Sequence, residues 1–308
     1  MVSSNSHRPC GPNAGGGIIC YTIRLMSQPP LAECLTLAVQ AAHRAGRLLA
    51  AHRGRPRTVQ TKRSDIDLVT EIDRGSERLI HETIRRRFPE HGFLGEERLH
   101  TNPGAPYRWL VDPVDGTTNF VHGVPAFAVS IGLLQGDTPL VGVVYDPARR
   151  DLFTAIAGRG ARHNGRRIQV SRRKTLAVSL LSTGFSAKFR TNPTPYLRWF
   201  TALQSRCHAV RRMGCTSLSL AYVACGWQDG FYEQDLWPWD VAAGLLLIRE
   251  AGGRVTDFCG KPVRLAHGEV AASNGWIHRE LLSHLTAPPH RLDSLRSRVG
   301  VERLRRRR

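Results

Sequence analysis

Hydrophobic residues recur at helical spacing over the first stretch of the chain that has a regular pattern. Between residue 31 and about residue 51 they define one apolar stripe, made by Leu31, Leu35, Ala38, Ala42, Ala45 and Leu49. A second helix is predicted to begin near Asp73, because the short carboxylate of aspartate suits an N-cap. Its inner side would carry Leu79, Ile80, Thr83, Ile84 and Phe88.

The middle of the chain changes to the pattern of strands. A short apolar strand is predicted at residues 107–111, and three more follow at residues 126–134, 140–145 and 152–156. A turn at residues 135–139 joins the first two of those three. Neighbouring strands with such short turns form an antiparallel sheet.

The second half of the chain alternates strands with helices. Strands are predicted at residues 177–182, 208–213, 230–233, 254–257 and 270–273, and helices at residues 195–205, 217–225 and 239–251. Such alternation indicates a mixed or parallel sheet with helices on both faces. The fold class is therefore α/β (mixed α+β), with an α+β subdomain at residues 31–175 and an α/β subdomain at residues 176–288.

Both ends of the chain lack this periodicity. Residues 1–30 are polar and rich in glycine, which predicts a disordered extension. Met26 stands just before the first helix, so translation starting at Met26 is a hypothesis alongside Met1. Residues 289–308 form a basic tail, with eight arginines between Arg291 and Arg308.

Length, hydropathy and cysteine content describe one compact protein. The chain has 308 residues with 41% hydrophobic content, enough to bury a large core. No apolar run approaches the ~20 residues that span a bilayer, so we expect a soluble, cytoplasmic protein with no membrane partner. The seven cysteines include no C-x-x-C pair, which favours reduced thiols over a zinc site or a disulfide framework.

The net charge of +19 raises the question of a polyanionic partner. All but four of the 44 basic residues are arginine, a skew typical of codon composition, so most are expected on solvated faces. The basic tail is the exception. It cannot pack against itself, and it is a candidate for contact with RNA or a transcription complex.

Candidate chemistry gathers around Pro113. Asp112 and Asp115 flank this proline, which is expected to end the preceding strand and let the two carboxylates converge. Gly116 and Thr117 follow where a helix could begin and bind an anion. A bare Asp-Pro-Val-Asp-Gly segment could be only a turn.

Acidic residues elsewhere in the chain favour a metal site over a turn. Glu96 and Glu97 follow an apolar stretch, and Asp240 opens a strong helix far downstream. Carboxylates from several separate element ends are what a Mg²⁺ site needs, because Mg²⁺ binds oxygen ligands and keeps water and substrate phosphate among them.

Three motifs carry a resemblance to a known family. They are Gly-Glu-Glu at residues 95–97, W-x-x-D-P-x-D-G-T-T-N-F at residues 109–120, and W-D-x-A-A-G at residues 239–244. Together they closely resemble the signature motifs of the inositol monophosphatase family, of the bacterial inositol-1-monophosphatase type. The resemblance covers roughly residues 31–285, and it implies the layered α-β-α-β-α sandwich of the sugar phosphatases, with the active site between the two halves.

The resemblance also implies roles for individual residues. Two to three Mg²⁺ ions would be held by Glu96, Asp112, the carbonyl of Val114, Asp115 and Asp240. The catalytic residues implied are Glu96, and Thr117 hydrogen-bonded to Asp67 as the pair that orients the attacking water. The substrate-binding positions implied are Asp115, Gly116, Thr117, Thr216, Glu233 and Asp240, with Lys62 supporting the cluster. An Asx turn at Asp67 and a helix cap at Asp73 are the structural alternatives.

The implied activity is hydrolysis of inositol 1-phosphate and related small polyol phosphates by a Mg²⁺-dependent, lithium-sensitive homodimer. Glu233 favours a polyol, because a carboxylate can accept hydrogen bonds from ring hydroxyls. Histidinol phosphate, 3′-phosphoadenosine 5′-phosphate and fructose 1,6-bisphosphate are alternative substrates in the same fold. A role in binding RNA or a transcription complex is an alternative of another class.

Overall fold

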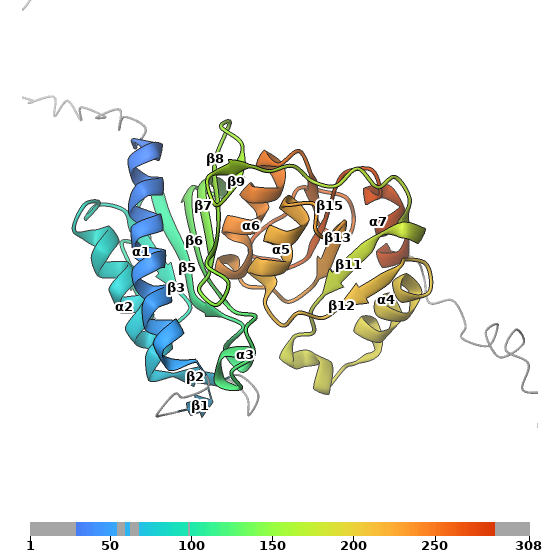
Figure 1. Ribbon diagram of the computed structural model, residues 1–308, viewed down its shortest axis with the longest axis horizontal. Helices are drawn as coiled ribbons and strands as arrows, with labels where there is room; N and C mark the ends of the chain where they lie inside the picture. The colour runs from blue at the N-terminus through green and yellow to red at the C-terminus, as the bar shows by residue number, and fades with distance from the viewer. Residues whose placement is uncertain (1–28, 54–58, 62–67, 98, 287–308) are drawn as a thin grey trace, which may run out of the picture.

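The computed structural model describes residues 29–53, 59–61, 68–97 and 99–286 (Figure 1). The predicted N-terminal extension up to residue 28, the hypothesis of a start at Met26, and the basic tail from residue 289 lie outside the described residues. Lys62 and Asp67 also lie outside them. Most of the remaining predictions fall on described residues.

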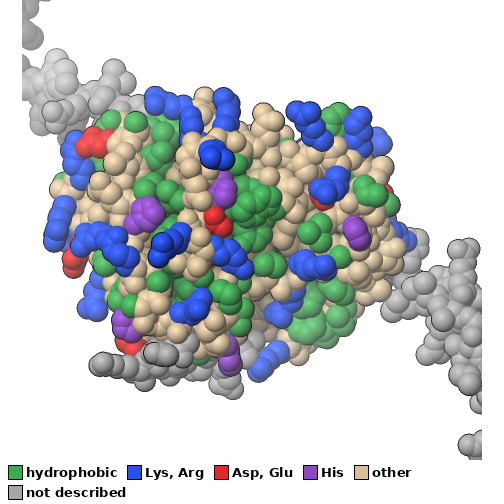
Figure 2. Space-filling model, in the orientation of Figure 1, with side chains coloured by type: hydrophobic (Ala, Val, Ile, Leu, Met, Phe, Trp, Pro, Cys, Tyr) green, Lys and Arg blue, Asp and Glu red, His purple; other side chains and the backbone are tan. Residues whose placement is uncertain are grey.

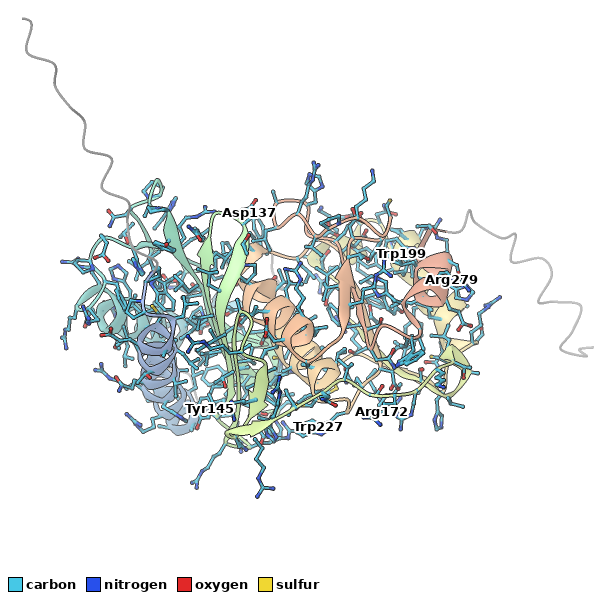
Figure 3. All side chains as sticks on the ribbon, turned by 90° about the horizontal axis from the view of Figure 1, so that it is seen from above. Asp137, Tyr145, Arg172, Trp199, Trp227 and Arg279 are labelled. Atoms are coloured by element: carbon cyan, nitrogen blue, oxygen red, sulfur yellow. The ribbon has the colours of Figure 1, made fainter. Side chains whose placement is uncertain are left out.

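The elements form five layers (Figure 1). Helices α1 (Leu31–His52) and α2 (Glu71–Arg85) cover one face of an eight-stranded sheet. Helices α4 (Thr194–Gln204) and α7 (His278–Thr286) cover the far face of a five-stranded sheet. Figure 3 shows the same arrangement from above, with Tyr145 on the side of the large sheet and Trp199 on the side of the small one.

The middle layer consists of α5 (Thr216–Ala224) and α6 (Pro238–Glu250), which lie between the two sheets (Figure 1). Both helices are buried on nearly all sides, because each has a sheet on either side of it. Helix α6 approaches the large sheet closely at two glycines. A Cβ on Gly132 would lie 2.8 Å from the Cβ of Ala242, and a Cβ on Gly142 would lie 2.8 Å from the carbonyl oxygen of Ala243. The predicted α-β-α-β-α sandwich is confirmed.

The large sheet has the strand order β10-β9-β8-β7-β6-β5-β3-β4. Its strands are β3 (Gly92–Gly95), β4 (His100–Thr101), β5 (Tyr107–Asp115), β6 (Ala128–Gln135), β7 (Thr138–Asp146), β8 (Asp151–Ile156), β9 (Ala161–His163) and β10 (Arg166–Arg167). Every neighbouring pair is antiparallel except β3 and β5, which are parallel. The predicted antiparallel pairing is confirmed, and the parallel pair brings the ends of β3 and β5 to one edge.

The small sheet is mixed and has the strand order β12-β11-β13-β15-β14. Its strands are β11 (Leu180–Thr183), β12 (Ala209–Arg211), β13 (Gly230–Glu233), β14 (Arg254–Thr256) and β15 (Val270–Ser273). Strand β11 is parallel to both of its neighbours, and β15 is antiparallel to both of its own. Short elements complete the described fold: β1 (Val59–Thr61), β2 (Leu68–Thr70), α3 (Thr117–Val121), η1 (Leu176–Val178) and η2 (Ala187–Arg190).

Two local predictions were wrong. Strand β5 does not end before Pro113 but continues to Asp115, because the interruption at Pro113 is absorbed by a register shift against β6 between Asp112 and Asp115. Helix α2 begins at Glu71, so Asp73 is not its N-cap but a fully buried residue of its first turn.

The surface carries the excess basic charge in separate groups. Figure 2 shows Lys and Arg side chains spread over the visible face, with hydrophobic and neutral polar side chains between them. No helix within the described ranges is long and apolar enough to cross a membrane.

Candidate active site

Four acidic residues lie at the ends of elements that meet on one side of the middle layer. Glu96 follows β3, Asp112 and Asp115 lie at the end of β5, and Asp240 is in the first turn of α6. The backbone N–H of Glu96 donates to the carbonyl oxygen of Val111 at 3.1 Å, which holds the end of β3 against β5. The structure therefore brings together the four carboxylates predicted as metal ligands.

Burial and neighbouring negative charges shift the pKa values of two of these carboxylates. Burial raises the pKa of Asp112 well above its usual range, and the charges of Glu96, Asp115 and Asp240 raise it further. Burial also raises the pKa of Asp240, with the charges of Glu96 and Asp115 acting in the same direction. The neighbouring carboxylates thus disfavour the charged forms of Asp112 and Asp240, so the cluster favours the binding of a cation.

The bulge in β5 shapes the loop that carries Asp112. The backbone N–H of Val114 donates to Asp112 Oδ1 at 2.9 Å, and the carbonyl oxygen of Val114 accepts from the Thr117 hydroxyl at 2.9 Å. Gly116 follows with φ of 88°, and a Cβ there would lie 2.9 Å from the carbonyl oxygen of Ala126. This left-handed residue starts the five-residue helix α3 immediately after the acidic pair.

Thr117 has a partner that the sequence analysis did not assign. Its hydroxyl lies 3.3 Å from Oδ1 of Asp73, in addition to its contact with Val114. Asp73 was predicted as a helix cap, and the predicted partner, Asp67, lies outside the described residues. Asp73 is buried in the first turn of the amphipathic helix α2. A buried acid needs a polar partner, so an aspartate at this position was the available signal for a contact with another element.

Asp115 also serves as the N-terminal cap of α5, a role that the sequence did not reveal. Its Oδ2 accepts from the Ser217 N–H at 2.5 Å, the Ser217 hydroxyl at 2.6 Å and the Cys215 thiol at 3.1 Å. Its Oδ1 accepts from the Thr216 N–H at 3.2 Å. Burial raises the pKa of Asp115, and these donors oppose that rise. The acid and the positive end of the helix stabilise each other.

Glu233 and Thr216, both predicted as substrate-binding positions, meet beside Asp115. The Thr216 hydroxyl donates to Glu233 Oε2 at 3.1 Å, and Glu233 is 9% exposed. Burial raises the pKa of Glu233 to about 8, and the charge of Asp115 adds to that shift. Gly184 makes room for this carboxylate, since a Cβ there would lie 2.1 Å from Glu233 Oε1.

The donor set fits Mg²⁺, although the side chains are not arranged as finished ligands. Within the described parts of the chain, no group of three or more His, Cys, Asp or Glu side chains is placed to hold a metal ion as it stands. Asp115 faces α5, and Oδ2 of Asp240 accepts from the Trp237 N–H at 2.8 Å. Buried carboxylate and carbonyl oxygens nevertheless match the ligands that Mg²⁺ prefers.

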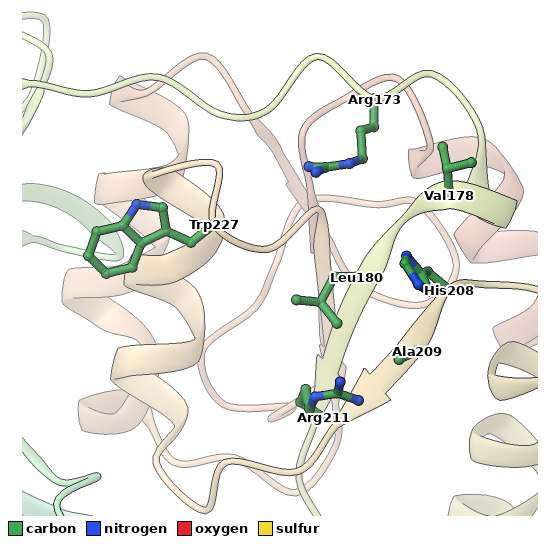
Figure 4. A pocket seen from close by; sticks show the side chains of 7 residues that line it. All are labelled: Arg173, Val178, Leu180, His208, Ala209, Arg211 and Trp227. Carbon is green, nitrogen blue, oxygen red and sulfur yellow. The ribbon is translucent and has the colours of Figure 1, made fainter.

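A separate hollow of about 220 Å³ lies on the small sheet (Figure 4). It is lined by Arg173, Val178, Leu180, His208, Ala209, Arg211 and Trp227. None of the predicted site residues is among them. The hollow is basic where the cluster is acidic, so it takes no part in the proposed chemistry.

Comparisons with known proteins agree with the fold. The model of the inositol monophosphatase family matches residues 31–288. The chain is 44% identical over 270 residues to the Nus factor SuhB of Pseudomonas aeruginosa, covering 85% of this chain and 98% of that protein. It is 43% identical over 269 residues to an inositol-1-monophosphatase of Synechocystis sp., covering 86% and 93%.

A solved structure agrees as well. An inositol monophosphatase from Anabaena sp. superposes with a TM-score of 0.78 at 42% identity, over 86% of this chain and 99% of that one. Such a fold with such a site defines a phosphatase of the layered sandwich class. The chain belongs to the inositol monophosphatase family.

Proposed function

We propose that this protein is a Mg²⁺-dependent phosphomonoesterase that hydrolyses inositol 1-phosphate and related small polyol phosphates. The observation that supports this most directly is the convergence of Glu96, Asp112, Asp115 and Asp240 at the ends of β3, β5 and α6, where neighbouring carboxylates raise the pKa of Asp112 and Asp240. The similarity to the Synechocystis inositol-1-monophosphatase supports the substrate.

The metal-holding residues are those of the acid cluster. Glu96, Asp112 and the carbonyl of Val114 would hold one ion, and Asp112, Asp115 and Asp240 a second, with Glu96 also contributing to a looser third. When bound, Mg²⁺ supplies Lewis-acid activation of water and neutralises the charge that develops on the leaving oxygen. Asp112 belongs to both ligand sets. It is only 3% exposed, so bulk water does not reach it.

Thr117 would orient the attacking water, and a carboxylate would accept the hydrogen bond of its hydroxyl. The contact between Thr117 and Asp73 supports Asp73 as that carboxylate, and Asp67, the partner implied by the family resemblance, stays the alternative. The hydroxyl donates to only one acceptor at a time, either Val114 or Asp73, and in both cases its lone pairs can accept from water. The N–H groups of Gly116 and Thr117 would hold phosphate oxygens, and Lys62 would support the same charge.

The alcohol part of the substrate would lie against Glu233 and Thr216. Their hydrogen bond presents a buried carboxylate and a hydroxyl side by side, which suits a ring with several hydroxyl groups. Histidinol phosphate, 3′-phosphoadenosine 5′-phosphate and fructose 1,6-bisphosphate remain the alternative substrates.

A panel of these four phosphate esters, with phosphate release measured at several Mg²⁺ concentrations, tests the proposal. We expect inositol 1-phosphate to have the highest kcat/KM, EDTA to abolish the activity, and Li⁺ to inhibit it. Preference for another ester would correct the substrate, and activity that persists in EDTA would contradict the metal assignment.

A second function is favoured by the similarity to the Nus factor SuhB of Pseudomonas aeruginosa. We propose that the arginine-rich tail at residues 289–308 contacts RNA or a transcription complex, in addition to the phosphatase activity. We also propose that the protein is a cytoplasmic homodimer. Light scattering of the purified chain tests the dimer.

A further inference from the structure

Glu77 of α2 is a buried carboxylate that holds the turn carrying Glu96. It is 1% exposed, and it lies on the side of the large sheet opposite to the middle layer. Its Oε2 accepts from the N–H of Glu97 at 2.6 Å, and its Oε1 accepts from the N–H of Leu99 at 2.9 Å. Both oxygens therefore bind backbone of the segment that follows β3.

This turn encloses the carboxylate tightly. The N–H of Gly95 donates to the carbonyl oxygen of Leu99 at 2.9 Å, which closes the turn around Glu77. A Cβ on Gly95 would lie 2.1 Å from Glu77 Oε2, so the position accepts only glycine while Glu77 stays where it is. The position of the Glu77 carboxylate therefore depends on glycine at residue 95.

The arrangement holds Glu96 from both sides. The N–H of Glu96 is bound to Val111 of β5, and the next N–H along the chain, that of Glu97, is bound to Glu77. With both peptide groups held, the backbone of Glu96 has little freedom, and its side chain makes a hydrogen bond with Asp112.

We propose that Glu77 is a positioning residue for the metal site, which acts through the turn at residues 95–99 to place Glu96 for cation binding. This inference rests on the proposed function for the identity of the cation, but not for the geometry. Glu77 itself binds no ligand in this scheme. Its contribution is to hold a carboxylate of the cluster in place before a cation arrives.

Two variants test this contact, one at Glu77 and one at Gly95. Glu77→Gln keeps the size of the side chain but replaces one acceptor oxygen with an NH₂ group that faces an N–H donor. Gly95→Ala keeps Glu77 and pushes its carboxylate away. Glu82→Gln is the matched control, because Glu82 is an exposed glutamate on the same helix.

Binding of Mn²⁺, followed by electron paramagnetic resonance of the full chain, is the primary measurement, since it needs no substrate. We expect Glu77→Gln and Gly95→Ala to raise the dissociation constant for Mn²⁺ at least about 10-fold, because removal of support behind a metal ligand typically costs 10–100-fold in affinity. Glu82→Gln should bind as the wild type does. Unchanged Mn²⁺ binding in a folded Glu77→Gln variant would overturn the inference, whatever its thermal stability.

Kinetics separate this inference from the proposed function. With inositol 1-phosphate we expect Glu77→Gln to raise the half-saturating Mg²⁺ concentration about 10-fold, and to change the substrate KM less than about twofold at saturating Mg²⁺. A wild-type protein that binds Mn²⁺ but releases no phosphate would contradict the proposed function and leave the role of Glu77 standing. A shift in substrate KM alone would contradict the role of Glu77.

Discussion

At the scale of single residues, the acid cluster is the feature from which the activity follows. Asp240→Asn removes one charged oxygen ligand, and we expect at least a ~100-fold loss of turnover at saturating Mg²⁺, with the folded structure retained. Asp137→Asn is the control, because Asp137 is exposed in the turn between β6 and β7 (Figure 3), which lies beside Tyr107 at the end of β5 opposite to Asp112 and Asp115. Near-normal turnover of Asp240→Asn would remove Asp240 from the metal site.

Asp115→Asn should show two effects instead of one. We expect the same ~100-fold or greater loss of turnover, because a ligand is lost. We also expect a lower unfolding temperature, because the amide NH₂ would face donors from Ser217 or Thr216 at the start of α5. Thermal unfolding without Mg²⁺ measures the second effect separately. An unchanged melting temperature would mean that the capping contacts of Asp115 contribute little to stability.

Thr117→Ala should lower kcat more than it changes KM, because the proposed role of its hydroxyl is to orient water and not to hold substrate. Asp73→Asn should reproduce this split if Asp73 is the carboxylate behind Thr117, as their 3.3 Å contact suggests. Asp67→Asn is the comparison. A larger kcat effect at Asp67 than at Asp73 would restore the partner implied by the family resemblance, and a change confined to KM would contradict the pair altogether.

At the scale of elements, His278 joins α7 to the small sheet. Its Nε2 lies 2.9 Å from the Thr256 hydroxyl of β14, and its Nδ1 lies 2.9 Å from the Ser273 hydroxyl of β15. Burial lowers the pKa of His278 from 6.5 to about 4, and the charge of Arg254 acts in the same direction. The folded protein therefore keeps this ring neutral where the unfolded chain would protonate it.

The consequence is a loss of stability in acid. Below about pH 6.5 the unfolded state binds the extra proton, so the contribution of His278 to folding falls as the pH drops from about 6.5 toward about 4. Urea unfolding of the wild type should show a loss on the order of 2 kcal/mol from this residue by roughly pH 4.5. His278→Gln should flatten that part of the profile, whereas His267→Gln, at an exposed histidine, should not. Parallel profiles for wild type and His278→Gln would contradict the assignment.

Elements were predicted best where one pattern ran over many residues. Helix α1 matches its predicted range closely, because its apolar positions repeat at helical spacing over 22 residues. Strands β13 and β15 also match their predicted ranges, although each has only four residues. The end of β5 and the start of α2 were misplaced. At those two points local rules about proline and N-caps were outweighed by contacts with β6 and with Thr117, which are distant in sequence.

At the scale of the whole molecule, the basic tail at residues 289–308 lies outside residues 31–288, which match the family. Deleting residues 291–308 should leave phosphatase activity within about twofold, because a terminal segment contributes little to the core. RNA affinity of the full chain should fall steeply between low and physiological salt, since eight arginines beside a phosphate backbone release condensed counterions. The deletion should flatten that slope. An unchanged slope would mean that the tail does not bind RNA and that its arginines reflect codon composition.

The sequence by itself determined the class of fold and the order of its main elements, and it supplied the acids that we propose for the site. Hydrophobic periodicity follows from burial of one face or two, and it can be read along the chain without knowing what covers that face. The spacing of Asp112, Asp115 and Gly116 is local and marked a candidate site, but by itself it was also compatible with a turn. Acids elsewhere in the chain, Glu96 and Asp240 among them, favoured a metal site.

Only the tertiary structure decided which residues surround those acids. Asp73 meets Thr117, Ser217 meets Asp115, and Glu77 supports the turn of Glu96 across sequence separations of 44, 102 and about 20 residues. Each is a short polar contact between elements, and such contacts depend on how sheets and helices stack. A buried polar side chain must find a partner, but the chain alone does not say which one, because its hydrophobic pattern records burial and not neighbours.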